Sequence, residues 1–225
     1  MQLEAIAYYH SPLGEKFGTP RQSGLVPELC GTVVFTEKYR DPNALRGLEQ
    51  MSHLWLIWGF SENRETAGDW QPTVRPPRLG GNTALGVFAT RSPYRPNPLG
   101  LSAVALERIE SDPELGTVLH VRGADLVDGT PVYDIKPYIR YADCIPEAQS
   151  GFATLPPPEK LRVQVADGLV LPFKQDEMCV LTQLLSLDPR PAYQDNPERI
   201  YTMNYAGKEV SFRVEGDVLT LLFIE

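Results

Sequence analysis

Residues 84–109 read ALGVFATRSPYRPNPLGLSAVALERI and place a proline-rich loop between two apolar, strand-like runs. Each proline restricts its own φ angle and biases the preceding residue towards extended geometry. The loop therefore has little conformational entropy to lose when it binds a partner. It carries Arg91, Tyr94, Arg95 and Asn97, whose side chains can form bidentate, stacking and amide contacts. We interpret the loop as a binding site, with a rigid solvent-exposed turn as the alternative.

Short strand-like segments recur through the first 145 residues at a spacing of roughly ten residues. They are expected at residues 3–8, 30–35, 54–60, 84–89, 101–109, 117–121 and 131–135. Residues 41–47 predict a short helix, with Asp41 at its start and Gly47 at its end. This rhythm, with little helix, predicts a mainly β fold that is either a barrel or a sandwich.

The composition changes near residue 145. Residues 148–160 are rich in proline and predict a linker. Beyond it, a helix is expected at 177–187 and a three-stranded antiparallel unit at 199–204, 208–214 and 218–224. We therefore expect a first domain over residues 1–147 and a small α+β domain over residues 161–225. Because about 65 residues are near the lower limit for an independent core, the second domain should pack against the first or against a partner subunit.

The composition of the whole chain is ordinary for a soluble globular protein, with 42% hydrophobic and 22% charged residues. The apolar runs are strand-sized, and no basic region followed by an apolar block opens the chain. We expect neither a membrane span nor a secretory signal. Cys30, Cys144 and Cys179 are scattered, so they are interpreted as reduced thiols in a cytoplasmic protein.

The net charge of −8 argues against a nucleic-acid partner only superficially, because the charge is unevenly distributed. Residues 66–106 contain four arginines and one aspartate, which gives this segment a charge of +3. The segment includes the proline-rich loop. A polyanion could bind there although the protein as a whole is acidic. A local fluctuation of four charges is the alternative explanation.

Several familiar signatures are absent. No GxGxxG motif follows a strand, which argues against the usual dinucleotide or adenosyl site on a doubly wound sheet. P-loop, HExxH and GxSxG motifs are also absent. The three histidines, His10, His53 and His120, are isolated and are more typical of core or capping residues. His53 is the best candidate among them for a direct role, since it opens an apolar strand.

A second informative segment, residues 122–138, brings three carboxylates, a lysine and two tyrosines together. Asp125 and Asp128 could simply cap the turn at residues 128–131. If this segment lies beside the arginine-rich loop, the two form a cleft with acceptors on one wall and donors on the other. A metal site is not favoured, because no histidine joins the carboxylates.

These segments resemble the TsaA-like (YaeB, TrmO) family of S-adenosylmethionine-dependent tRNA methyltransferases. The matching segments are 17–22 (FGTPRQ), 47–49 (GLE), 52–55 (SHLW), 74–82 (VRPPRLGGN), 86–92 (GVFATRS), 95–100 (RPNPLG), 125–131 (DLVDGTP), 134–138 (DIKPY) and 188–193 (DPRPAY). The similarity is dense over residues 1–145. Arg140 stands where the family typically has proline, which leaves the site assignments unchanged.

The resemblance implies a small antiparallel β-barrel followed by a small α+β domain, with two subunits of a homodimer contributing to one cofactor site. It also implies methylation of N6 of the adenosine at tRNA position 37, after that base has received a threonylcarbamoyl group. The implied S-adenosylmethionine contacts are Pro20, Arg21, Gln22, Phe60, Ser61, Arg91, Leu101, Arg122, Gly123, Ala124 and Asp125.

The residue types suit this chemistry. Arg91 could bind the cofactor's carboxylate in bidentate fashion, and a carboxylate near the acceptor nitrogen would help to remove its proton. Asp128 and Asp134 are the candidates for that catalytic role. The candidate contacts to the tRNA anticodon stem-loop are Arg75, Arg78, Tyr94, Arg95, Asn97, Lys136 and Tyr138. A non-catalytic module that binds RNA or the cofactor, or a small-molecule methyltransferase, remains the alternative.

Overall fold

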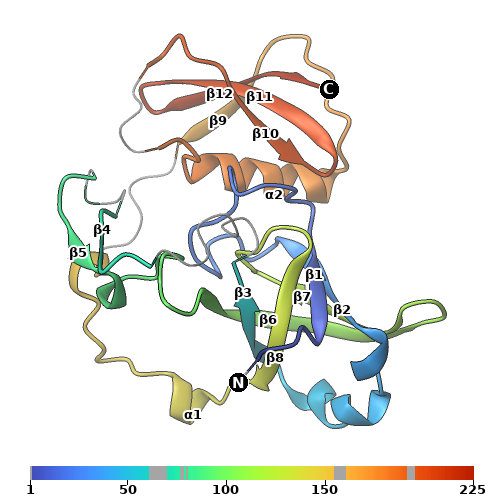
Figure 1. Cartoon of the computed structure of the whole chain (residues 1–225). Helices are drawn as coiled ribbons and strands as arrows, with labels where there is room; N and C mark the ends of the chain where they lie inside the picture. The colour runs from blue at the N-terminus through green and yellow to red at the C-terminus, as the bar shows by residue number, and fades with distance from the viewer. Residues whose placement is uncertain (1, 61–69, 77–78, 80, 155–160, 192–195) are drawn as a thin grey trace.

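The computed structural model describes residues 2–60, 70–76, 79, 81–154, 161–191 and 196–225. Figure 1 shows a β-barrel in the lower part of the molecule and a second sheet with a helix above it. The mainly β architecture with a small antiparallel barrel and an α+β C-terminal unit is confirmed. In the part of the chain that the structure describes, no helix is long and apolar enough to cross a membrane.

Six strands close the barrel in the order β1-β2-β7-β6-β3-β8, and every neighbouring pair is antiparallel. The strands are β1 (Ala7–His10), β2 (Cys30–Phe35), β3 (His53–Gly59), β6 (Leu99–Asp112), β7 (Gly116–Arg122) and β8 (Thr130–Pro137). On β3, Leu54, Leu56 and Trp58 point into the barrel, because side chains alternate along a strand. Closure leaves each of these strands with two partners, which removes exposed sheet edges.

Shorter elements connect the barrel strands. They are the 3₁₀ turns Glu37–Tyr39, Pro42–Leu45, Leu48–Gln50 and Val87–Ala89, and the two-stranded ribbon of β4 (Thr73–Val74) and β5 (Leu85–Gly86). The helix expected at residues 41–47 is one of these 3₁₀ turns, capped by the Asp41 side chain as its sequence indicates. The strand expected at 84–89 is paired only at Leu85–Gly86, since the chain then turns to bury Val87. The chain leaves the barrel through α1 (Arg140–Asp143) and the 3₁₀ turn Gly151–Ala153.

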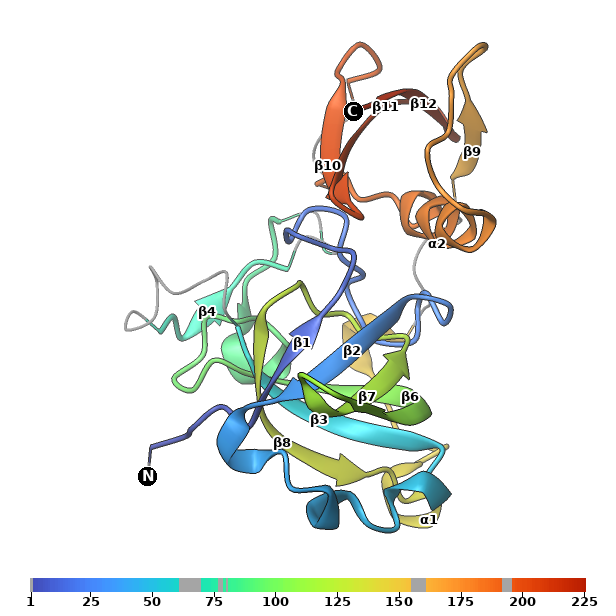
Figure 2. The same cartoon turned by 90° about the vertical axis from the view of Figure 1, so that its right-hand side faces the viewer.

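The C-terminal unit is a four-stranded sheet with α2 (Gln175–Ser186) packed on one face (Figure 2). Its strand order is β10 (Tyr201–Tyr205), β11 (Lys208–Glu215), β12 (Val218–Ile224) and β9 (Arg162–Val165). The three expected antiparallel strands are confirmed as β10, β11 and β12, and the sequence analysis missed β9, a fourth strand parallel to β12. This four-residue strand directly follows the proline-rich segment, so its own sequence carries little periodic signal.

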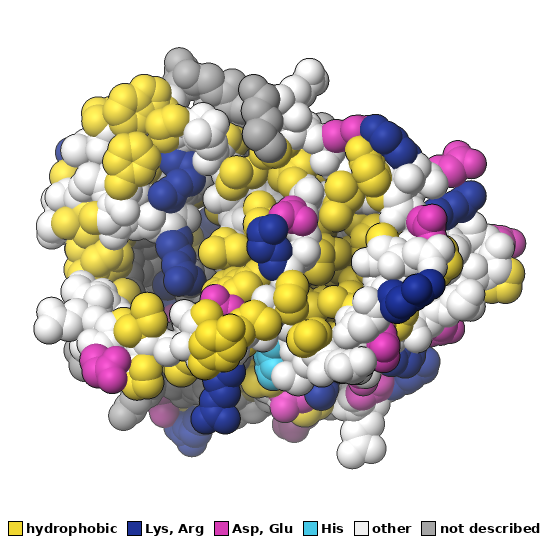
Figure 3. All heavy atoms as spheres, turned by 90° about the horizontal axis from the view of Figure 1, so that it is seen from below, with side chains coloured by type: hydrophobic (Ala, Val, Ile, Leu, Met, Phe, Trp, Pro, Cys, Tyr) yellow, Lys and Arg dark blue, Asp and Glu magenta, His cyan; other side chains and the backbone are white. Residues whose placement is uncertain are grey.

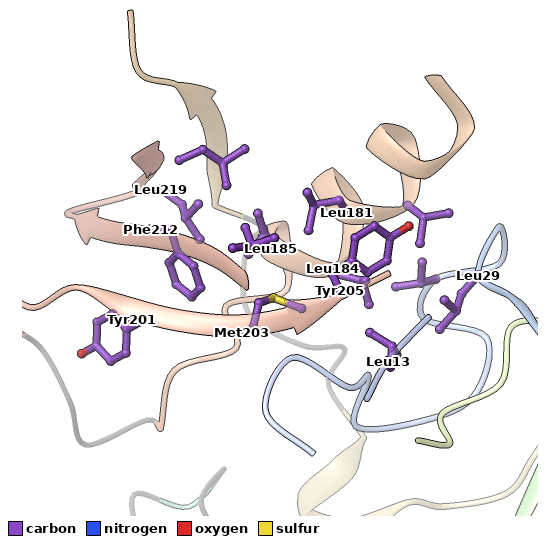
Figure 4. Close-up of a cluster of buried hydrophobic side chains, with 14 of the residues drawn as sticks. Leu13, Leu29, Leu181, Leu184, Leu185, Tyr201, Met203, Tyr205, Phe212 and Leu219 are labelled. Carbon is purple, nitrogen blue, oxygen red and sulfur yellow. The ribbon is translucent and has the colours of Figure 1, made fainter. Parts of the chain in front are cut away.

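The β1–β2 connection, residues 11–29, forms part of the C-terminal core. Leu13 and Leu29 are fully buried there with α2 and the sheet, as Figure 4 shows. Phe17 stacks on Phe212, with ring centroids 6.3 Å apart. The backbone amide of Ala206 donates to the carbonyl of Pro12 at 2.7 Å. The second domain therefore packs against the first, as expected, and does so through a barrel loop.

This shared core makes a barrel loop important for the stability of the C-terminal unit. We expect Leu29→Ala to lower the free energy of unfolding by about 2–5 kcal/mol, because it opens a cavity at a fully buried site. Leu115→Ala is the matched control, since Leu115 is 47% exposed and its loss should cost less than about 0.5 kcal/mol. Urea unfolding measures both. Equal destabilisation by the two substitutions would contradict the shared core.

Candidate functional site

Three connections meet at one end of the barrel, which we call the loop end. Neighbouring strands alternate in direction, so the connections 11–29, 60–98 and 123–129 all leave from this end. The first and the third are joined by backbone hydrogen bonds, from Gly24 to Gly123 at 2.8 Å and from Gly123 to Leu29 at 2.9 Å. Gly123 has a φ of +78°, a conformation that favours glycine. The fold thus assembles segments that are about 100 residues apart in the sequence.

The second connection reaches the first through Arg91. The guanidinium of Arg91 donates a hydrogen bond to the side-chain carbonyl of Gln22. Pro20 is buried beside these residues, and the Arg21 guanidinium donates to the backbone carbonyl of Arg190 at 3.2 Å. The C-terminal unit therefore contacts the segment from which Gln22 meets Arg91.

Asp125 is the carboxylate at the centre of the loop end. Its Oδ1 accepts a hydrogen bond from the Ser102 hydroxyl at 2.5 Å, and Ser102 Oγ accepts one from Trp58 Nε1 at 3.0 Å. Ser102 and Trp58 are buried on β6 and β3, so this chain anchors the loop carboxylate to the barrel wall. Gly100 makes the arrangement possible, because a Cβ there would collide with the Trp58 indole.

Burial raises the pKa of Asp125 above its usual range. The Ser102 hydroxyl, the Arg91 guanidinium and the backbone amide of Ser23 oppose this shift, since each favours the ionised carboxylate. Raised pKa values of partly buried carboxyl groups are common in functional sites. The loop end therefore combines a desolvated acceptor with a nearby cation, which suits a small ligand that carries both hydroxyl and carboxylate groups.

Phe60 and Leu101 are the two large apolar side chains among the expected cofactor contacts. The Phe60 ring lies edge-on to Trp58 with centroids 4.5 Å apart, and its backbone amide donates to Pro98 at 3.1 Å. Phe60 thus covers the barrel core at the loop end. Leu101 lies on the outer face of β6 and is 55% exposed, so it points away from Asp125's partner Ser102 on the same strand. Of the remaining expected contacts, Arg122 is exposed and Ala124 is buried.

The two candidate catalytic carboxylates lie in different places. Asp128 is half exposed in the 123–129 connection, and its Oδ1 contacts His10 Nδ1 and the Ser11 amide at 3.1 Å each. Asp134 lies midway along β8, opposite Ile57, and pairs with Lys136 at 2.9 Å. Only Asp128 belongs to the loop end.

The expected RNA contacts are also divided. Arg75, Tyr94 and Asn97 are exposed in the 60–98 connection, whereas Arg95 donates to the carbonyls of Thr90 and Ser92 at 3.1 and 3.0 Å and braces the loop. Lys136 and Tyr138 lie towards the opposite end of β8, about 20 Å from the loop end by strand rise. The Tyr138 ring packs beside Trp55 at 5.5 Å. Ser61 and Arg78 lie outside the described residues.

Sequence reasoning missed Ser102, Trp58 and His10. A serine in the apolar run 99–106, at a position that faces the barrel, is a signal that could have been used, because a buried hydroxyl requires a partner. His53, the histidine favoured from the sequence, lies at the opposite end of β3 with its Nδ1 3.0 Å from Ser52 Oγ. In the described part of the chain, no three His, Cys, Asp or Glu side chains are grouped to hold a metal ion.

The fold defines a class of protein, namely a small antiparallel barrel with an α+β C-terminal unit and a candidate ligand site built from loops at one barrel end. The model of the tRNA-methyltransferase O N-terminal domain matches residues 8–144, and that of the TrmO C-terminal domain matches residues 173–225. The chain belongs to the TrmO family.

Individual relatives agree with this assignment. The chain is 43% identical over 203 residues to the tRNA (adenine(37)-N6)-methyltransferase of Escherichia coli K12, with 88% of this chain and 85% of that protein covered. It is 44% identical over 205 residues to the putative S-adenosylmethionine-dependent methyltransferase RcsF of Pseudomonas aeruginosa, covering 87% and 85%. The crystal structure of TrmO from Pseudomonas aeruginosa matches with a TM-score of 0.79 and 32% identity, covering 100% of this chain and 98% of that one.

The raised pKa of Asp125 gives a pH-dependent prediction. Because the folded-state pKa lies above that of the unfolded chain, ionising Asp125 costs folding free energy as the pH rises through the folded value. We expect Asp125→Asn to gain stability relative to the unsubstituted, cofactor-free protein as the pH rises from about 4 to about 8. Urea unfolding at a series of pH values measures this difference.

Asp217→Asn is the matched control, because the hydrogen bond from Arg162 lowers the pKa of Asp217. Its substitution should change stability in the opposite direction, and only slightly, since this pair is exposed. A gain for Asp125→Asn that does not vary with pH would contradict the assignment.

Proposed function

We propose that this protein transfers a methyl group from S-adenosylmethionine to N6 of adenosine 37 in tRNA, where that base carries a threonylcarbamoyl group. The observation that carries the proposal is the meeting of Gln22, Arg91 and Asp125 at the loop end of a barrel of the TrmO family. The names of the Escherichia coli and Pseudomonas aeruginosa relatives support the reaction and the cofactor. The threonylcarbamoyl group follows from the resemblance of the sequence motifs.

The residues at the loop end fit this cofactor. Arg91 would hold its carboxylate, which a guanidinium can bind in bidentate fashion. Asp125, kept in place by Ser102, would accept hydrogen bonds from a ribose hydroxyl or an amino group. Phe60 would provide an apolar wall and exclude water. When bound, S-adenosylmethionine supplies an electrophilic methyl group on a positively charged sulfur.

The remaining task of the protein is to align the acceptor nitrogen and remove its proton. As the new nitrogen–carbon bond forms and the sulfur–carbon bond breaks, the N6 proton must pass to a base. Asp128 is our candidate, since it lies in the same connection as Asp125 and its two contacts use one oxygen. Asp134 fits this role less well, because it is paired with Lys136 outside the loop end. Alignment itself supplies a large part of the rate of an in-line displacement.

We infer that tRNA approaches over the 60–98 connection. Arg75 is exposed there and, like Arg91 and Arg95, forms no ion pair with the acidic residues that the structure describes. Exposed arginines of this kind suit phosphate contacts. Arg95 is better suited to bracing the loop than to binding a phosphate, because its guanidinium donates to two carbonyls of that loop.

We also propose a homodimer in which the outer face of β6, β3 and β8 meets a second copy. Leu101 is 55% exposed on this face, and Tyr141 and Ile145, just beyond β8, are 92% and 65% exposed. Figure 3 shows hydrophobic side chains spread over the middle of the molecule seen from below, where the barrel lies. Apolar patches of this kind are typical of protein–protein interfaces. In such a dimer, Leu101 of one subunit would lie near the cofactor site of the other subunit, because it points away from the site of its own chain.

Arg91 provides the direct test of the cofactor site. Arg91→Ala should weaken S-adenosylmethionine binding by about 2 kcal/mol, because a charge-assisted contact is lost. Arg213→Ala is the matched control, since Arg213 is an exposed arginine on β11 of the C-terminal sheet. Isothermal calorimetry with both folded variants makes the comparison. Undiminished affinity in Arg91→Ala would refute this site.

The substrate is tested by methyl transfer from labelled cofactor to two tRNA preparations. One carries threonylcarbamoyladenosine at position 37, and the other is transcribed without modification. We expect labelling of the modified tRNA only, because an acidic protein must depend on the modified base for recognition. Equal labelling of both preparations would refute the threonylcarbamoyl requirement. Labelling of neither would favour a non-catalytic module or a small-molecule methyltransferase.

A further inference from the structure

Two aromatic side chains lie exposed and stacked beside the β4–β5 ribbon. The rings of Trp70 and Phe88 have centroids 6.4 Å apart and an interplanar angle of 21°. Trp70 is 49% exposed and Phe88 is 73% exposed. Neither ring is needed to fill either of the two hydrophobic cores, whose members lie elsewhere. An exposed pair of large aromatic rings is a typical feature of a binding surface.

Backbone hydrogen bonds hold the residues next to both rings. Val87 is buried, and its amide donates to the Pro72 carbonyl at 3.0 Å, which fixes the residue next to Phe88. The amide of Gln71, next to Trp70, donates to the Tyr94 carbonyl at 3.3 Å. The neighbour of Trp70 is therefore bonded to the proline-rich loop, and the neighbour of Phe88 is bonded to Pro72, just before β4. Because the pair is preorganised, little entropy would be lost when a ligand stacks on it.

The surroundings of the pair favour an anionic partner. Arg91 follows Phe88 by three positions in the chain, so the two Cα atoms are at most about 11 Å apart. Arg91 contacts Gln22 in the proposed cofactor site, and Arg75 is exposed just beyond β4. Figure 3 shows Lys or Arg side chains beside hydrophobic ones on the side of the molecule where Figure 1 has β4 and β5. Aromatic rings beside arginines are the combination that binds unpaired bases of RNA loops.

We propose that Trp70 and Phe88 form a stacking platform for the nucleobase that neighbours the methylated adenosine in the anticodon loop. This inference rests on the proposed function. The platform holds the adjacent nucleotide while Arg75 meets the phosphate backbone, so that the target base is directed towards the loop end. A second protein surface is a less suitable occupant, because Arg75 would then need an acidic residue at one position, whereas RNA offers a phosphate at every nucleotide.

The test uses the full-length protein and a synthetic anticodon stem-loop that carries threonylcarbamoyladenosine. Phe88→Ala should weaken binding of this RNA about 5- to 150-fold, the range for loss of one base–aromatic stack. Phe88→Trp should retain binding, because it restores an aromatic surface. Phe223→Ala is the matched control, since Phe223 is 45% exposed on β12 in the C-terminal sheet and its loss should leave RNA affinity unchanged.

Two further RNAs identify the stacked base. One has an abasic residue directly before position 37, and the other has an abasic residue directly after it. The RNA that lacks the stacked base should bind the unsubstituted protein as weakly as the intact RNA binds Phe88→Ala. Combining this RNA with Phe88→Ala should cause no further loss of affinity. Full additivity at both positions would overturn the platform. A change in mass by light scattering, or an equal loss of cofactor affinity in Phe88→Ala, would also overturn it and assign the rings to the subunit contact or the cofactor site.

These outcomes are separate from a failure of the proposed function. If the unsubstituted protein methylates the modified tRNA and Phe88→Ala binds RNA normally, only the platform is refuted. If the unsubstituted protein methylates no tRNA, the proposed function itself is refuted.

Discussion

The alternation of strand direction around the closed barrel is the constraint on which the candidate site depends. Because every neighbouring pair is antiparallel, the connections 11–29, 60–98 and 123–129 must leave from the same end. The backbone hydrogen bonds of Gly123 with Gly24 and Leu29 then hold two of them together, and the Arg91 contact with Gln22 adds the third. A barrel wall that cannot open at an edge gives these loops a fixed base, which favours a preorganised ligand site.

The C-terminal unit contributes to this arrangement although it supplies none of the expected cofactor contacts. The 11–29 connection has buried residues in the C-terminal core, and Gly18 allows a close approach to Met203 with a φ of +88°. Arg21 and Gln22 follow directly on this packed segment. The C-terminal sheet and α2 therefore restrict the loop from which Gln22 contacts Arg91. This provides a physical reason for joining an α+β unit to a barrel whose candidate ligand site lies between its own loops.

Charge and burial have different roles at Asp125 and along the 60–98 connection. At Asp125, desolvation raises the carboxyl pKa, and Ser102 and Arg91 limit that effect, so the electrostatic interactions there are local. Along the 60–98 connection, exposed arginines and aromatic rings face solvent instead. The rest of the protein is acidic, which suppresses non-specific binding of polyanions. A small positive surface can therefore recognise RNA without making the whole protein basic.

The sequence by itself determined most strands, α2 and the proline-rich loop, because alternation, helical periodicity and proline act within a few residues. The resemblance of its motifs to the TrmO family predicted that the strands form a barrel. Only the tertiary structure decided which residues meet. The Arg91 contact with Gln22, the Ser102 bridge to Asp125 and the burial of Leu29 in the C-terminal core join positions distant in sequence. The tertiary structure also places Lys136 and Tyr138 far from the loop end, since the eight residues of β8 extend away from that end. Local patterns carry no information on such contacts, because strand register and loop packing are properties of the whole barrel.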